Sequence, residues 1–114
     1  MATFKLSIVS PAGKAFEGEA ESVVAPGREG SLGVLVHHAP MIAALRPGVC
    51  TVKAGGEPAI FFTGEGVIEV SHGETVLLVD EATRVEKLDD ARDLLRRRID
   101  RQARTAAPAA GGAS

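Results

Sequence analysis

Short apolar or alternating segments recur through about the first eighty residues, and turn residues rather than helices separate them. "FKLSIV" alternates, so that Phe4, Leu6 and Ile8 would share one face of a strand. "SPAGK" then predicts a turn in which Gly13 is free to adopt a positive φ. Further segments follow at similar spacing: "AESVVAP", "GVLV", "GVCTVKA", "AIFFTG", "GVIEVS" and "TVLLVD". This rhythm favours an antiparallel β-sandwich or barrel over a parallel sheet.

The periodicity becomes helical after these segments. Leu88, Ala91, Leu95 and Ile99 recur at helical spacing and form one narrow apolar stripe. Aspartates lie in the first turns and arginines in the last, which suits the helix dipole. We therefore expect a mainly β protein with three parts: an N-terminal antiparallel β-sandwich domain over 1–84, one main C-terminal helix over 85–105 and a disordered tail over 106–114.

Composition and charge narrow the possible partners. The net charge is −2, and the chain has four Phe but no Trp or Tyr, so side chains that could stack on nucleic-acid bases are scarce. The arginines of the helix alternate with aspartates, a pattern typical of a solvated, salt-bridged face. We expect no nucleic-acid partner, and an adaptor sandwich with a nucleic-acid-binding arginine helix is an alternative.

The single cysteine, Cys50, cannot form an internal disulfide. No apolar run approaches the roughly 20 residues that span a bilayer, and the first residues resemble neither a signal peptide nor a transit peptide. We expect a cytosolic protein that reaches a membrane only through other proteins.

One stretch, "APGREGSLGVLVHHAPMIAAL", raises the question of a chemical site. Gly27, Gly30 and Gly33 lack both the Lys-Ser/Thr of a phosphate loop and the spacing of a dinucleotide fingerprint. His37 and His38 are consecutive, so on a strand they would point to opposite faces and could not share a metal ion. No nucleophile-elbow motif is present. We expect no catalytic residue, metal or cofactor, and we interpret the stretch as a contact surface.

Several motifs in order resemble a known family. They are "FxLxIVSPxG" at 4–13, "FxGEAESVVAPG" at 16–27, "EGSLGVL" at 29–35, "HAPMIAALRPGV" at 38–49, "GxGVIEV" at 64–70 and "LDDAR" at 88–92. Over 3 to about 104, the chain resembles the epsilon subunit of the F-type ATP synthase, known as delta in mitochondria.

The resemblance implies a non-catalytic rotor subunit. Its β-sandwich would bind the gamma subunit, rest on the ring of c subunits and help to transmit torque, at the cytoplasmic face of a bacterial plasma membrane. The implied c-ring contacts are Glu29, Gly30, Ser31 and His38. The implied gamma contacts are Ser10, Met41 and Ala43. The helix could also reach the alpha and beta subunits of the catalytic head.

Three departures from the family pattern qualify these expectations. Only one helix of the family's C-terminal hairpin is expected, which would reduce inhibition of ATP hydrolysis. The family's ATP-binding motif keeps Asp89 and Arg92, but Asp93 replaces its alanine, and a second carboxylate would repel a triphosphate. We therefore interpret Asp89 as a helix-start residue, with an ATP-binding sensor as the alternative function. His37 stands where the family commonly has glycine, and we hypothesise that it adds a titratable group at the rotor contact.

Overall fold

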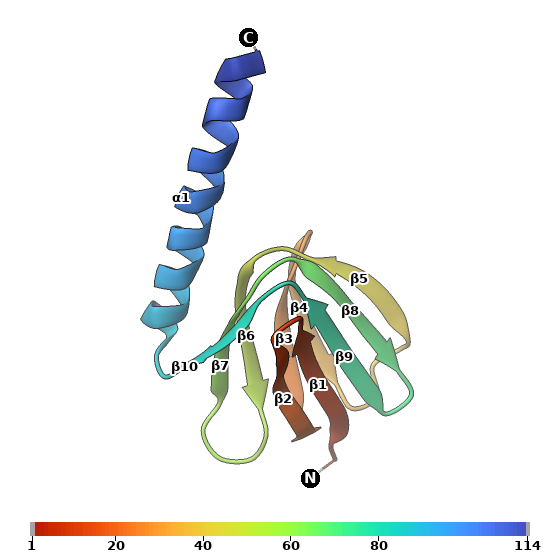
Figure 1. The fold of residues 1–114 in the computed structure, drawn as a ribbon. Coiled ribbons are helices and arrows are strands. Elements are labelled where there is room, and N and C mark those ends of the chain that lie inside the picture. Colours follow the sequence, from red (N-terminus) through yellow and green to blue (C-terminus); the bar gives the residue numbers. More distant parts are fainter. Residues whose placement is uncertain (1, 114) are drawn as a thin grey trace.

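The structure, a computed structural model, describes residues 2–113 and the side chains of 2–104. Ten strands precede one helix (Figure 1). In chain order they are β1 (Phe4–Ser10), β2 (Gly13–Ala20), β3 (Ser22–Gly27), β4 (Gly30–Leu35), β5 (Met41–Leu45), β6 (Gly48–Lys53), β7 (Ala59–Thr63), β8 (Gly66–Ser71), β9 (Glu74–Val79), β10 (Ala82–Val85) and α1 (Leu88–Ala113). The prediction of a mainly β chain that ends in a helix is confirmed.

One hydrogen-bonded path runs β10-β7-β6-β3-β5-β8-β9-β1-β2, with β4 added on the free side of β3. The path folds over into a sandwich, because β10 at one end contacts β2 at the other. β3 joins the two halves of the path through the pair Gly27 and Leu45. All strand pairs are antiparallel except β1 with β9, which are parallel. These two strands lie far apart in the sequence, so no hairpin forces them to run in opposite directions.

The core lies between the layers and consists mostly of Val, Leu, Ile and Ala side chains. The alternation in β1 is confirmed, because Phe4, Leu6 and Ile8 are all buried. Phe61 is also fully buried, and its ring lies edge-on to that of Phe16 at a centroid distance of 6.2 Å. Aliphatic packing therefore carries most of the stabilisation of this core.

Glycines with a positive φ lie at the turns between neighbouring strands. Gly13, Gly55 and Gly73 have φ values of 127°, 80° and 69°, in the region that residues with a Cβ rarely adopt. Each lies at or next to a turn between strands that pair as a hairpin, so the local sequence fixes where these strands reverse.

The helix packs against β6, β7 and β10, on the side of the sandwich away from β5 and β8 (Figure 1). Part of the predicted stripe is wrong: Ala91 is buried and Leu95 half-buried, but Leu88 and Ile99 are 39% and 54% exposed. Arg98, which is 7% exposed, completes the packed face instead. The reason is electrostatic, since two carboxylates lie on the sandwich where the third turn meets it.

The helix begins later than the expected 85 and continues to Ala113, beyond the expected end at 105. The side chains of 106–114 lie outside the described part of the structure. The prediction of disorder over this range is therefore not tested and stays a prediction. Within the described part of the chain, no helix combines the length and the apolar character needed to cross a membrane.

Candidate partner-binding surfaces

The glycine-rich stretch forms the hairpin between β3 and β4. Gly27 pairs with Gly30, and Arg28 and Glu29 make the turn. A Cβ on Gly27 would lie 2.5 Å from the carbonyl oxygen of Gly30, and Gly30 itself has a φ of 138°. The two glycines are therefore required for the tight reversal, which agrees with the interpretation of this stretch as a surface hairpin.

The residues expected at the c-ring do not lie together. Glu29 lies in the turn before β4, and Gly30 and Ser31 begin that strand, whereas His38 follows its other end. A strand of six residues is about 17 Å long, so one small contact cannot include both groups. The structure thus separates His38 from the other three predicted residues.

The histidines lie in the loop after β4. The backbone amide of His38 donates to the carbonyl oxygen of Leu35 at 3.0 Å, and its ring Nδ1 lies 2.8 Å from the carbonyl oxygen of Ala39. His37 lines a shallow depression with Val36 and His38. In residues 2–113, no group of three His, Cys, Asp or Glu side chains is placed to hold a metal ion.

A groove of about 410 Å³ lies between the β3–β4 hairpin and β5. Its lining includes Glu29 and Gly30 from the hairpin, and Met41 and Ala43 from β5. Residues expected to face two different partners therefore line one groove. Met41 and Ala43 are half-buried against the core, whereas Ile42 between them is 71% exposed. The side chain that β5 offers most fully to a partner is thus Ile42.

An apolar row crosses the outer face of β5, β8, β9 and β1. The register places Ala44 opposite Val67, Val67 opposite Leu78, and Leu78 opposite Val9. Val67 is 39% exposed and Leu78 51% exposed. Ile42 lies on the same face, two residues before Ala44. We call Val9, Ile42, Ala44, Val67 and Leu78 the apolar row. Exposed apolar side chains that adjoin one another mark interaction surfaces more often than single ones do.

The sequence predictions did not include the apolar row, although a signal for it was present. Val67 precedes the buried Ile68, and Leu78 follows the buried Leu77, so both faces of β8 and β9 carry apolar side chains. A strand with one face in water normally alternates between apolar and polar residues. The loss of alternation at these two places could have predicted a covered outer face. Ser10 lies next to the row, at the end of β1.

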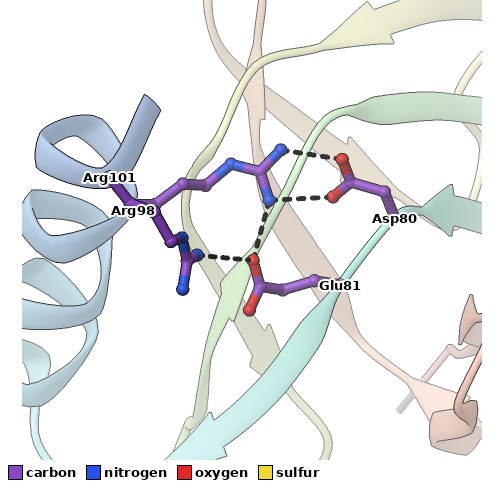
Figure 2. Close-up of polar contacts among 4 residues, drawn as sticks. All are labelled: Asp80, Glu81, Arg98 and Arg101. Carbon is purple, nitrogen blue, oxygen red and sulfur yellow. Dashed lines mark hydrogen bonds and ion pairs between the residues drawn. The ribbon is translucent and has the colours of Figure 1, made fainter. Parts of the chain in front are cut away.

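A cluster of charged side chains joins α1 to the sandwich (Figure 2). Arg98 donates two hydrogen bonds to the carboxylate of Asp80, at 3.0 and 2.7 Å, and one to Glu81 at 2.7 Å. The hydrogen bonds that Arg98 donates to Asp80 raise the pKa of the Arg98 guanidinium, against the opposing effect of its desolvation. The predicted ATP-binding pair differs: Asp89 and Arg92 are 91% and 61% exposed, and the ion pair between them is long at 4.0 Å.

The comparisons with known proteins agree with one another. Residues 3–85 match the family model described as ATP synthase, Delta/Epsilon chain, beta-sandwich domain. The ATP synthase epsilon chain of Nitrobacter winogradskyi is 48% identical over 91 residues, which are 80% of this chain and 67% of the relative. The epsilon chain of Bradyrhizobium sp. is 46% identical over 89 residues, or 78% of this chain and 66% of the relative. The chain thus spans about two thirds of the length of these relatives.

Solved structures share the fold. A chain in the Euglena gracilis mitochondrial ATP synthase (OSCP/F1/c-ring) aligns with a TM-score of 0.71 and 22% identity, over 81% of this chain and 59% of that chain. A chain in the central stalk and c-ring of the Tetrahymena thermophila mitochondrial ATP synthase gives a TM-score of 0.61 and 14% identity, over 69% of this chain and 64% of that one. The solved structures support the fold, and the similarity in sequence supports the common ancestry. This chain belongs to the ATP synthase delta/epsilon family through its β-sandwich domain.

Proposed function

We propose that this chain is a non-catalytic central-stalk subunit of a proton-translocating ATP synthase, and that it links the gamma subunit to the c-ring. The solved relatives come from ATP synthase assemblies whose descriptions name the c-ring, and one of them names the central stalk. A protein in this position transmits torque through its surfaces and needs no catalytic group of its own. Its place would be the cytoplasmic face of a bacterial plasma membrane, held there by the complex.

The apolar row is the observation that carries the proposal. It crosses four neighbouring strands of the sheet, and all of its side chains except the half-buried Val9 are exposed. Burying apolar surface contributes about 25 cal/mol per Å², so such a face suits a lasting partner rather than a brief encounter. We assign the row to the gamma subunit.

The predicted contacts divide between two surfaces under this proposal. Ser10 lies beside the row and stays a proposed gamma contact, while Ile42 and Ala44 supply the exposed side chains of the "MIAAL" segment in place of the half-buried Met41 and Ala43. Glu29, Gly30 and Ser31 stay the proposed c-ring contact at the tip of the β3–β4 hairpin. His38 is left outside that contact by its position beyond the other end of β4.

A pair of matched valine substitutions tests the proposal. Val67→Glu places a charge in the apolar row, whereas Val24→Glu places one on β3, at a residue with similar exposure: 39% against 43%. We expect Val67→Glu to weaken binding to the purified gamma–c-ring subcomplex by about tenfold or more, because a carboxylate would be desolvated in the interface. We expect Val24→Glu to bind as the unmodified chain does.

Binding would be followed by surface-based kinetics, with circular dichroism to show that both variants fold. Equal binding by the unmodified chain and Val67→Glu would contradict the assignment of the row. No binding by the unmodified chain would contradict the rotor function itself. The alternative of an ATP sensor has no supporting observation, since Asp89 and Arg92 both face solvent on the first turn of α1.

A further inference from the structure

The two proposed partner surfaces meet where the β3–β4 hairpin joins β5 (Figure 1). The hairpin tip carries the proposed c-ring contact, and β5 carries Ile42 and Ala44 of the apolar row. Among the strands of the described chain, β3 and β5 pair at a single position, Gly27 with Leu45. Gly27 directly precedes the hairpin turn, and Leu45 directly follows Ala44. A force that enters at the hairpin tip therefore reaches the apolar row most directly through this junction.

The junction has few backbone hydrogen bonds. The amide of Arg28 donates to the carbonyl oxygen of Ala44, and the amide of Arg46 donates to that of Pro26, both at 2.9 Å. Opposite residues of an antiparallel ladder can exchange two such bonds. Pro26 has no amide hydrogen to donate to Arg46 in return, so the backbone alone leaves the base of the hairpin one hydrogen bond short of a regular ladder.

The side chain of Arg46 adds a bond at the same place. Its Nε donates to the carbonyl oxygen of Gly27 at 3.2 Å, in a part-buried position. A hydrogen bond from a charged donor is stronger than one between neutral groups. The accepting carbonyl belongs to the residue directly before the turn at Arg28 and Glu29, so the bond holds the hairpin at its base.

The residues that follow Arg46 suit this bond. A Cβ on Gly48 would lie 2.8 Å from Cβ of Pro26 and 3.8 Å from a guanidinium nitrogen of Arg46. The missing side chain at Gly48 therefore leaves room for β3 to lie close. Pro47 restricts the backbone of Arg46 to extended conformations, which limits the directions in which its side chain can leave the chain.

We propose that Arg46 is a positioning residue for the β3–β4 hairpin. Its bond to Gly27 fixes the hairpin relative to the apolar row, so that the contact at the hairpin tip transmits torque to the gamma subunit. This role rests on the proposed function, since it places the c-ring at the hairpin and gamma at the row. Arg46 acts through the hairpin, so its loss should loosen the hairpin while the chain stays bound.

Amide hydrogen exchange of the isolated full chain tests the positioning. Arg46→Met keeps an unbranched side chain but removes the donor, whereas Arg46→Lys keeps a cationic donor. We expect Arg46→Met to lower the protection of amides over 28–32 by about fivefold or more, because the hairpin base loses a hydrogen bond from a charged group. Arg46→Lys should restore most of this protection, and protection in β1 and β8 should stay unchanged.

Arg28→Met is the matched control. It removes an equal charge one residue beyond Gly27, but Arg28 contributes to the junction through its backbone amide, which the substitution leaves in place. We expect its hairpin to be protected as in the unmodified chain. Full protection over 28–32 in Arg46→Met, or an equal loss in Arg28→Met, would overturn the positioning role of the Arg46 side chain.

Coupling in the assembled ATP synthase tests the consequence. The complex would be reconstituted into vesicles with the unmodified chain, Arg46→Met or Arg46→Lys, and proton pumping would be measured per ATP hydrolysed. We expect Arg46→Met to lose part of the pumping and Arg46→Lys to regain it. Binding of Arg46→Met to the purified gamma–c-ring subcomplex should stay within about threefold of the unmodified chain, because the apolar surface that it buries is unchanged.

The outcomes separate this role from the rotor function. Lowered hairpin protection together with full coupling in Arg46→Met would overturn the part of Arg46 in torque transmission. A loss of binding as large as the loss of coupling would also overturn it, because Arg46 would then act in attachment. If the unmodified chain does not bind the subcomplex, the rotor function fails, and the exchange experiment still decides whether Arg46 positions the hairpin.

Discussion

At the scale of single residues, Cys50 shows how burial changes chemistry. Its side chain is fully buried in β6, and desolvation raises the pKa of the thiol from 9.0 to about 12. The thiolate is the reactive form, so we expect native protein to resist a disulfide reagent at pH 8 and denatured protein to react at once. The measurement is the rate at which Cys50 reacts with the reagent, with and without denaturant. Fast reaction of the native chain would show that β6 opens easily.

The same shift predicts how stability depends on pH. Between pH 9 and about 12 the unfolded thiol loses its proton while the folded thiol keeps it, so the free energy of unfolding should fall as pH rises. Below pH 9 both states are protonated and the effect vanishes. Denaturant unfolding of the unmodified chain and Cys50→Ala at pH 8 and pH 11 isolates this contribution. A parallel pH dependence in the two proteins would contradict it.

At the scale of elements, β8 begins where two backbones approach closely. A Cβ on Gly66 would lie 1.9 Å from the carbonyl oxygen of Leu78 in β9, and backbone atoms cannot move aside as a side chain can. We expect Gly66→Ala to destabilise the fold by about 1–3 kcal/mol, as overpacking does. Gly56→Ala is the control, because nothing lies within 4 Å of its added Cβ and its φ is not positive. Equal unfolding midpoints for the two variants would refute this.

The elements also differ in how well their sequences predict them. The strands follow from alternation and turn glycines, because both depend on neighbours in the sequence. The packed face of α1 does not: Ile99 fits the helical stripe yet is 54% exposed, and the charged Arg98 is buried. Which face a helix buries depends on the surface that receives it, here Phe62 and two carboxylates after β9. The parallel pairing of β1 with β9 was likewise not predictable, since it joins distant segments.

At the scale of the whole molecule, the sequence assigns partner contacts to residues of shared motifs, but it does not show which of these residues lie on one surface. The hairpin residues Glu29, Gly30 and Ser31 lie together as expected, because they are consecutive. His38 lies at the other end of β4, and Met41 and Ala43 turn toward the core. A surface is assembled from several strands, so only the register of the sheet reveals that Val67 and Leu78 adjoin.

The sandwich and the helix should be separable at this scale. The core cluster contains buried residues of β1 to β9 and none from α1, so the fragment 1–86 retains all of it. We expect this fragment to fold cooperatively but to lose about 1.5–3 kcal/mol of stability, because Phe62 is no longer covered. The measurement is thermal unfolding of the fragment and the full chain, together with binding of a dye that reports exposed apolar surface.

The fragment should bind more of the dye than the full chain does, and Phe62→Ser in the fragment should remove this excess without further loss of stability, because the side chain is already exposed there. In the full chain the same substitution should be destabilising, since Phe62 lies beneath α1 and is 1% exposed. A fragment that unfolds without a cooperative transition would show instead that α1 is part of one indivisible unit. The helix would then be unable to leave the sandwich without unfolding it.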